Sequence, residues 1–289
     1  MFKKTVMLMA LIVFGVFVTI CAAQPPATPA TKATKATKAI VKTEAVKAAV
    51  ETLKPVIVKP DPMAVIDALL DAKGLDNFRK AIAACESILK SDPNNFEAAW
   101  RCAKSYREYG EEAKKREVRG WKDICAKYGK KGMQYAQKAI RLRPDKVNGY
   151  FFYGASVGIY ADGKGIITAL REGLKDKTQS NLEKAYKMDK DFEKGGTIVA
   201  LGRFWQVVPF PFSDKDKAMK LYREFQRTKY YADSIEGHIY LAELLSDTGS
   251  SMWGGNKNAR EVKRLVSQVN RLTRDPYWRN WGKRILNDL

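Results

Sequence analysis

The segment from Asp92 to Gly110, DPNNFEAAWRCAKSYREYG, constrains the fold of this 289-residue chain more than any other. Pro93 ends one helical pattern, and two asparagines then turn the chain. A small residue, Ala103, follows ten positions after the proline, and an aromatic residue, Tyr106, follows at thirteen. Small residues at such positions let paired helices approach closely, so the segment predicts a helix–turn–helix unit that Gly110 closes.

The same register recurs along the chain. Gly154 follows Pro144 at ten positions, and later copies centre on Gly202 and Ala242, so that successive register residues are 51, 48 and 40 positions apart. The pattern resembles the tetratricopeptide repeat (TPR), whose usual period is about 34 residues, with longer helices or inserts. We therefore expect an all-α fold, an α-solenoid or superhelical array of degenerate TPR-like antiparallel helix pairs.

Individual helices follow from apolar residues at three- and four-residue spacing after Met63. The segment Glu111–Arg143 contains Gly120, Gly129 and Gly132, which predicts two helices or one kinked helix. The other expected helices are Leu75–Lys90, Phe96–Tyr109, Ile166–Lys175, Asn181–Met188, Asp216–Arg227, Asn258–Arg271 and Tyr277–Leu286, the last two capping the array.

The N-terminal residues 1–23 have the pattern of a signal peptide. Lys3 and Lys4 precede the apolar run Val6–Ile20, which is short for a bilayer-spanning helix of roughly twenty residues. Cleavage after Ala23 is the preferred interpretation, and an uncleaved anchor is one alternative. A lipoprotein anchored through Cys21 is the other, because residues 18–21 resemble a lipoprotein box. Either way we expect export to the bacterial periplasm.

Residues 24–62 are dominated by Ala, Thr, Pro and Lys, and the triplet TKA occurs three times in residues 31–39. The segment has too little large apolar surface to offset the entropy of ordering, so it predicts a disordered tether. A cationic leash drawn to phosphorylated envelope surfaces is the functional alternative. Residues 63–289 would form the TPR-like helical domain.

Charge and cysteine content limit the partners. The formal net charge is +20 and the pI is near 9.7, which favours anionic partners. Export makes anionic lipid, glycan or an acidic protein the expected class rather than nucleic acid. After cleavage, Cys85, Cys102 and Cys125 remain, and their odd number argues against a disulfide framework and favours buried thiols.

A second resemblance covers roughly residues 144–249. Gly195-Gly196 leads into ALGRFWQVVPFPFSDKDKA (200–218), and HIYLAELLSDTG (238–249) follows. These motifs resemble exported TPR-like proteins related to the T-component of tripartite ATP-independent periplasmic (TRAP) transporters, although residues 212–214 read FSD where that family usually has Gly-Gly-Asp. The resemblance implies a soluble or lipid-anchored envelope protein that associates with a solute-binding protein.

Catalytic and metal motifs are weaker than the helical pattern. Residues 154–158, GASVG, match the G-x-S-x-G elbow of α/β-hydrolases, with Ser156 as nucleophile and His238 as base. That elbow needs a preceding strand and a parallel sheet, whereas the sequence predicts helices. One histidine and no C-x-x-C leave zinc without its usual ligands. Asp214 and Asp216 favour the start of a helix over a calcium site. We expect no enzymatic activity and no cofactor.

Repeat geometry instead predicts a binding surface on the concave face. Positions three before and one after each register residue tend to face the groove in TPR proteins. Trp100, Lys104, Phe151 and Arg203 occupy such positions, and Arg107 and Asn148 complete the set of candidate binding residues. Rings among cations suit a protein or peptide partner with an acidic segment or a C-terminal carboxylate. The sequence thus predicts a non-catalytic interaction or scaffold protein of the cell envelope. The alternative is a T-component-like transport accessory that binds a small or apolar ligand.

Overall fold

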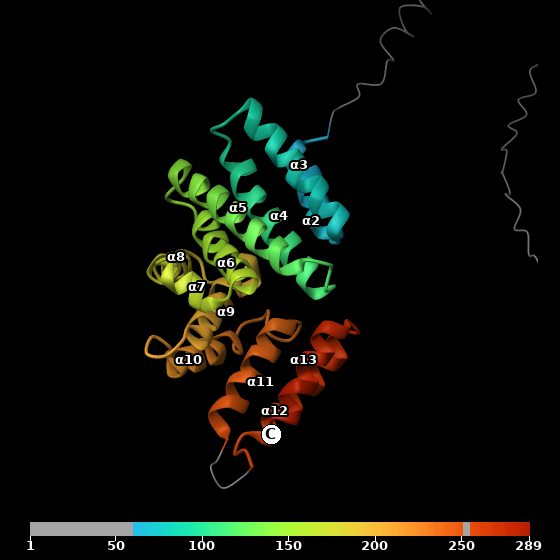
Figure 1. Ribbon diagram of the computed structural model, residues 1–289, viewed down its shortest axis with the longest axis vertical. Coiled ribbons are helices and arrows are strands. Elements are labelled where there is room, and N and C mark those ends of the chain that lie inside the picture. Colours follow the sequence, from blue (N-terminus) through green and yellow to red (C-terminus); the bar gives the residue numbers. More distant parts are fainter. Residues whose placement is uncertain (1–59, 251–254) are drawn as a thin grey trace, which may run out of the picture. The chain divides into compact units, whose positions relative to one another are not determined.

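The computed structural model describes residues 60–250 and 255–289, which form twelve α-helices joined by loops and turns, with no named strand among them (Figure 1). This confirms the expected all-α class. The helices are α2 Pro62–Ala72, α3 Leu75–Ser91, α4 Phe96–Lys115, α5 Trp121–Leu142, α6 Val147–Lys164, α7 Ile166–Arg171, α8 Leu174–Met188, α9 Phe192–Val207, α10 Lys215–Phe225, α11 Ile235–Gly249, α12 Ala259–Leu272 and α13 Pro276–Asn287.

The chain divides into two units, Met1–Val58 and Lys59–Leu289, and every described residue lies in the second. The expected signal peptide, the candidate lipidation site Cys21 and nearly all of the expected tether lie outside the described residues. Within the described part, no helix combines the length and the apolar character that crossing a bilayer requires.

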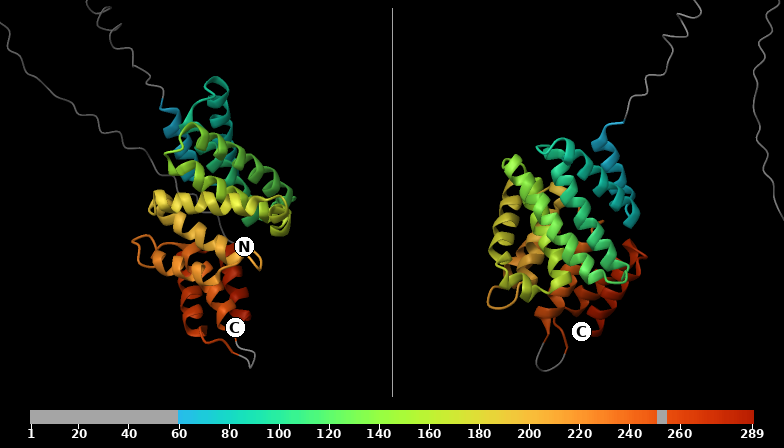
Figure 2. Two further views of the ribbon diagram at one scale, coloured as in Figure 1. Left: turned by 90° about the vertical axis from the view of Figure 1, so that its left-hand side faces the viewer. Right: turned by 45° about the horizontal axis from the view of Figure 1, so that its top comes forward.

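The helices form a continuous array of pairs (Figure 2). Helices adjacent in sequence pack against each other, as α3 does with α4 and α5 with α6, and the short α7 contacts both α6 and α8. The second helices of the pairs also touch: α4 contacts α6, α6 contacts α9, α9 contacts α11, and α11 contacts α13. Each pair therefore buries its apolar faces against the next, which is how an α-solenoid is stabilised.

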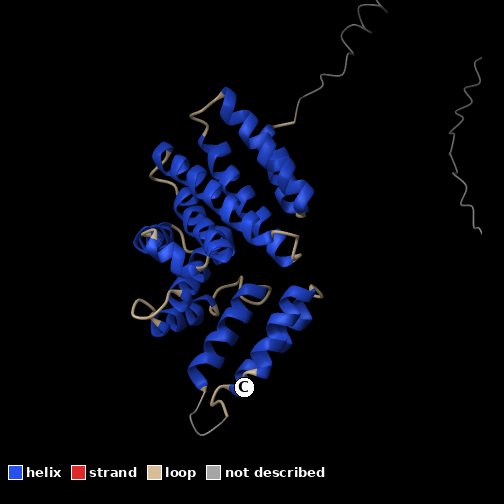
Figure 3. Ribbon diagram, in the orientation of Figure 1, coloured by secondary structure: helices blue, strands red, loops and turns tan. Residues whose placement is uncertain are grey.

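Short loops join these helices (Figure 3). Side-chain hydrogen bonds at the N-cap positions mark where several of the helices begin. The side chains of Asn95, Asp214 and Ser234 accept hydrogen bonds from the backbone N–H groups of residues 98, 217 and 237 at 2.9, 2.9 and 3.0 Å. These N-caps satisfy backbone donors that the first turn leaves free. The expected role of Asp214 at a helix start is confirmed.

Glycines that were expected to interrupt helices instead let helices approach. Gly129 and Gly132 lie inside the continuous helix α5, where they face α6. A Cβ at Gly129 would lie 2.7 Å from the Cα of Tyr160, so only glycine permits this helix–helix distance. Of the three glycines, only Gly120 interrupts the helical pattern, as expected. It has φ +74° and immediately precedes α5.

Two expectations about helix boundaries were wrong. Helix α4 does not end at Gly110 but continues to Lys115, because Gly110 packs against Ile159 of α6 rather than capping the helix. The expected amphipathic segment Ile166–Lys175 is split, since α7 ends at Arg171 and α8 already begins at Leu174.

An additional helix, α2, precedes the first expected pair. Arg101 of α4 donates to both carboxylate oxygens of Asp67 on α2, each at 2.7 Å. Ile66 and Leu70 of α2 are buried in the same core cluster as Phe78 and Ala99. This helix covers apolar surface that the first repeat would otherwise expose, as end-capping elements do.

Candidate binding groove on the inner helices

A cavity of about 460 Å³ lies among α4, α6, α7, α8, α9, α11 and α13, and we call it the inner groove. Its size falls in the range of about 300–1,000 Å³ that is typical of ligand pockets. Because its walls come from all five helix pairs, the stacking of repeats creates it, and no single repeat could form it alone.

One part of the inner groove is apolar. Its walls come from α6, from the short helix α7 and from the facing sides of α8 and α9. The apolar lining residues are Phe151, Val157, Ile159, Ile166, Leu170, Leu174, Leu182, Val199, Phe204, Val207, Val208 and Pro209. Gly154, Ala155, Gly158 and Ala200 also line it, so small side chains on α6 and α9 keep the space open.

Charged side chains from α4 form another part of the wall. Glu111 is buried and lies 3.7 Å from Arg107, 3.7 Å from Lys114 and 3.3 Å from Lys115. Burial alone would raise the pKa of Glu111, but these three cations hold it at about 2. Glu111 is therefore a fixed negative charge at neutral pH.

The same cations reach across to other helices. Lys114 pairs with Asp162 of α6 at 2.7 Å, and Arg107 lies 3.8 Å from Glu236 of α11. Lys115 lies 4.8 Å from the ring centroid of Trp278 on α13. The end of α4 is thus connected by charge and cation–π contacts to the last helix of the array.

A second charge pair lies beside the groove, where α9 meets α11. Arg203 of α9 pairs with Glu243 of α11, and its guanidinium lies 4.6 Å from the ring of Tyr240 and 5.3 Å from that of Trp281. Burial alone would lower the pKa of Arg203, but the carboxylate of Glu243 raises it above its usual range. Two aromatic rings and a carboxylate therefore hold this cation in place.

The structure brings three of the six predicted binding residues together. Arg107, Phe151 and Arg203 line the inner groove. The other three predicted residues do not belong to its lining. Trp100 stacks on Phe152 with ring centroids 5.9 Å apart, and Lys104 pairs with Glu193 at 2.7 Å.

The third of these, Asn148, is half-buried in the first turn of α6.

The pairing of the cations bears on the expected acidic partner. Lys104, Arg107 and Arg203 each have a carboxylate of their own chain within 4 Å. An anionic ligand would have to compete with these carboxylates, so the groove offers less net positive charge than the sequence suggested.

Sequence reasoning missed the lining residues from the last two helix pairs. Glu236, Tyr240, Tyr277 and Trp281 line the groove, although residues 277–286 were expected only to cap the array. One signal in the sequence could have predicted this lining. Tyr277 and Trp281 lie four positions apart on a short helix, and two large aromatic side chains on one face are more than a polar cap requires.

The serine of the GASVG motif is not placed for nucleophilic attack. Ser156 lies in the middle of α6 with 0% exposure, and its hydroxyl has no hydrogen-bond partner among the described residues. His238 is buried on α11, where its Nδ1 contacts the carbonyl of Ser234 at 2.6 Å and its ring stacks on Tyr231. Burial lowers the pKa of His238. Neither residue has the strand–turn–helix setting that the elbow needs.

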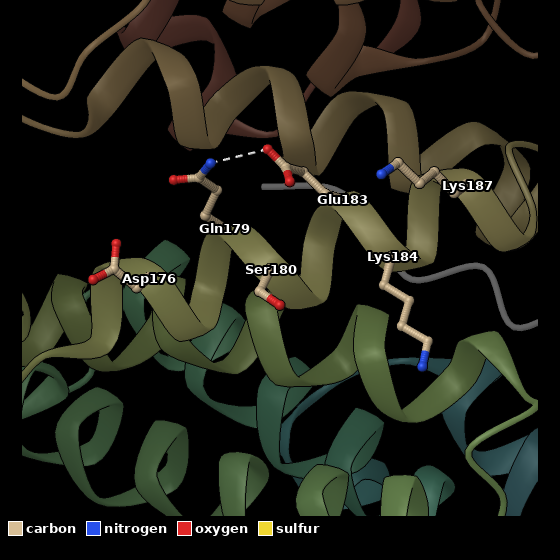
Figure 4. A pocket seen from close by; sticks show the side chains of 6 residues that line it. All are labelled: Asp176, Gln179, Ser180, Glu183, Lys184 and Lys187. Atoms are coloured by element: carbon tan, nitrogen blue, oxygen red, sulfur yellow. Dashed lines mark hydrogen bonds between the residues drawn. The ribbon is translucent and has the colours of Figure 1, made fainter.

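Two further features carry no site. The described residues contain no group of three or more His, Cys, Asp or Glu side chains that could hold a metal ion. A polar hollow of about 550 Å³ lies along α8 (Figure 4), where the side chain of Gln179 donates to Glu183 at 3.0 Å. All six of its lining residues come from this one helix, so it is a solvated helix face without a second wall.

Comparison with solved structures supports the fold. A thermophilic TPR protein of Thermus thermophilus matches 78% of this chain and all of its own length, with 14% identity and a TM-score of 0.54. The MamA protein matches 73% of this chain and 89% of its own, with 15% identity and a TM-score of 0.44. The TPR-like fold rests on the first of these.

Comparison of sequences gives a family. No curated protein matches the chain. The model of the family described as "Regulator of microtubule dynamics protein 1-3" matches residues 63–208, which is half of the chain and spans α2 to α9 with the apolar wall of the groove. The resemblance to the TRAP T-component proteins stays a prediction. This chain belongs to the regulator of microtubule dynamics protein 1-3 (RMD1-3) family.

Proposed function

We propose that this protein is a non-catalytic binding protein that holds a partner in the inner groove. The single observation that supports this is the groove itself, a space of about 460 Å³ whose walls are large apolar side chains on one side and fixed charges on the other. TPR-like arrays commonly bind partners on such inner surfaces, because each repeat adds a strip to one extended concave face.

The partner's chemistry follows from the lining. The cations of the groove are paired within the chain, so the largest gain on binding comes from apolar surface on α6, α7, α8 and α9. We expect the partner to insert an apolar segment, with one polar group reaching the Arg107 and Arg203 end. Binding of this kind depends on the area removed from water, at about 25 cal/mol per Å².

Gly158 offers a clean test of the groove. It lines the groove, and a Cβ placed there meets nothing within 4 Å, so Gly158→Phe should fill the space without disturbing helix packing. Ala83→Phe on the exposed face of α3 is the matched control. Proteins crosslinked in the native host by wild type and Ala83→Phe, but not by Gly158→Phe, would be the partners. Equal recovery with all three would contradict the proposal.

A transport accessory that binds a small apolar ligand is the second candidate. The size of the groove and its apolar wall favour it, since both suit a single drug-sized molecule. Native mass spectrometry of the purified protein separates the candidates. A bound small molecule that Gly158→Phe excludes would favour a transport role, whereas loss of a protein partner alone would favour the scaffold.

Location is part of the proposal. The pattern of residues 1–23 supports export to the periplasm, with anchoring through Cys21 as the alternative. Mass spectrometry of the mature N-terminus distinguishes a chain beginning at Gln24 from one with an acylated Cys21. An intact N-terminus on a cytosolic protein would refute export.

The family name gives a further candidate partner, the microtubule, which is an alternative to export because an exported protein would not meet it. The net charge of +20 would favour an anionic polymer of this kind. Co-sedimentation with polymerised tubulin at physiological salt tests it directly. Pelleting that disappears on modest salt addition would indicate only non-specific charge attraction, because exposed charges are screened within about 8–10 Å.

A further inference from the structure

The loop between α9 and α10 exposes aromatic side chains. Residues 207–212 read VVPFPF, six apolar residues in succession. Phe210 is 90% exposed, Phe212 is 41% exposed and Val207 is 38% exposed. We call residues 207–212 the Phe210 loop. Consecutive exposed apolar residues are uncommon in a folded domain unless they serve a contact with something else.

The Phe210 ring has no role in holding the loop. The backbone N–H of Phe212 donates to the carbonyl of Pro209 at 2.9 Å, and that of Asp214 donates to Trp205 at 3.1 Å. Asp214 then caps α10. Backbone hydrogen bonds therefore close the loop, and a polar side chain at position 210 would fold equally well.

Other exposed apolar side chains gather near this loop. Six large hydrophobic side chains are exposed among the described residues, and four of them belong to the loop or to α7, where Ile167 is 48% exposed. Val207, Val208 and Pro209 line the inner groove together with Ile166, the neighbour of Ile167. The Phe210 loop and α7 thus form an apolar rim where the groove opens. The remaining two, Val65 and Leu286, are single residues on α2 and α13.

Cations accompany this rim. Lys175 lies 4.8 Å from the ring centroid of Phe212 and also pairs with the exposed carboxylate of Asp176 at 2.8 Å. Lys164 and Arg171, one on each side of Ile167 in the sequence, are exposed, and neither has an ion-pair partner within 4 Å among the described residues. Apolar side chains at the tip with cations around them match the chemistry of an anionic lipid surface, where rings enter the interface and cations meet headgroups.

We propose that the Phe210 loop docks the domain on an anionic lipid bilayer, with Phe210 entering the interface and Lys164, Arg171 and Lys175 meeting the headgroups. The inner groove then opens toward the membrane. The docking surface does not depend on what the groove holds. The docking proposal can therefore be refuted without refuting the proposed binding function. A second copy of the chain covering the same rim would give a different outcome, stated below.

A probe inside the loop tests the proposal. The full chain with Cys21→Ser and Ser213→Cys carries an environment-sensitive NBD label at position 213, since the described cysteines are buried. Vesicles of phosphatidylcholine and phosphatidylglycerol are expected to brighten the label and shift its emission to the blue. A label at Ser87 on α3 should not respond. Phe210→Ser in the same background should weaken the response about tenfold or more, because a phenyl ring no longer leaves water.

Matched variants make the outcome decisive. Val65→Ser with Leu286→Ser removes exposed apolar side chains elsewhere and should leave the response unchanged. Absence of a vesicle response, or a response that Phe210→Ser does not change, would overturn the proposal. So would self-association that depends on Phe210 without any vesicle response, since that identifies a second copy. An equal response to phosphatidylcholine alone would overturn the role of the cations. Circular dichroism of Phe210→Ser should match the wild type.

Discussion

Arg203 of α9 and Glu243 of α11 form an ion pair beside the inner groove, and the same carboxylate joins two more side chains. Gln206 donates to it at 3.0 Å and the indole of Trp281 donates to it at 2.9 Å. One carboxylate therefore links α9, α11 and α13. Arg203, which the sequence suggested as a contact for an acidic partner, is instead paired with a carboxylate of its own chain.

Arg203→Glu should destabilise the domain. The change places a second carboxylate next to Glu243 in a half-buried site, where the lost pair and the new repulsion together cost about 2–3 kcal/mol. Thermal unfolding followed by circular dichroism measures the loss as a lower Tm. Lys131→Glu on the exposed face of α5 is the control and should change stability by less than about 0.5 kcal/mol. A variant with the Tm of wild type would show that the pair contributes nothing.

The repeat architecture could be predicted because it depends on local signals. A proline, a turn and a small residue at a fixed distance mark the first two register copies, and a small residue alone marks the next two. Helices α3, α12 and α13 lie within two residues of their expected bounds. Helix ends were predicted less well where glycine served packing. Gly110 and Gly129 read as breaks in the sequence, but their partners Ile159 and Tyr160 lie in another helix. A single sequence does not reveal such distant neighbours.

The groove could be predicted only in part for a related reason. Phe151 and Arg203 follow from the repeat register, which is local, whereas Arg107 was predicted in addition to the register positions. The lining residues of α11 and α13 reach the groove only because the array curves enough to bring Trp278 next to Lys115. That curvature is the sum of small rotations between successive pairs, and degenerate repeats of unequal length do not encode it in any one motif.

Two glycine-to-alanine changes on facing helices should have opposite effects. Gly129→Ala puts a methyl group against the backbone of Tyr160, which cannot move aside, and should cost about 1–3 kcal/mol through overpacking. Gly158→Ala meets nothing within 4 Å and should stabilise α6 by about 0.5–1 kcal/mol through helix propensity. Urea unfolding of both variants measures the difference. Equal stability of the two would mean that α5 and α6 are not in close contact.

The described cysteines should be unreactive in the folded protein. Cys85, Cys102 and Cys125 are free and fully buried, which agrees with the expected packing thiols. Burial raises the pKa of Cys125 to about 12 and that of Cys102 further, so neither forms a thiolate near pH 8. Ellman's reagent should react with these three thiols only after denaturant is added. Rapid reaction of any of them in buffer would show that its helix opens readily.

The buried carboxylate of Glu111 predicts a specific dependence of stability on pH. Its pKa in the folded protein is about 2, below the ordinary value of 4.5, because burial is outweighed by Lys114, Arg107 and Lys115. A lowered folded-state pKa stabilises the fold fully above pH 4.5, and the contribution is lost as pH falls from 4.5 toward 2. At neutral pH it amounts to about 3 kcal/mol, from about 1.4 kcal/mol per unit of pKa.

Glu111→Gln should therefore lower the free energy of unfolding by about 3 kcal/mol at pH 7, since three cations lose their shared counter-charge. The gap between variant and wild type should narrow as pH falls below 4.5, because the wild-type carboxylate becomes protonated as well. Glu112→Gln is the matched control: its carboxylate pairs with the exposed Arg116, and such surface pairs contribute about 0–1 kcal/mol. Urea unfolding at a series of pH values measures both variants. A gap for Glu111→Gln that stays constant from pH 7 to pH 3 would contradict the assignment, because a loss of packing alone would not vary with pH.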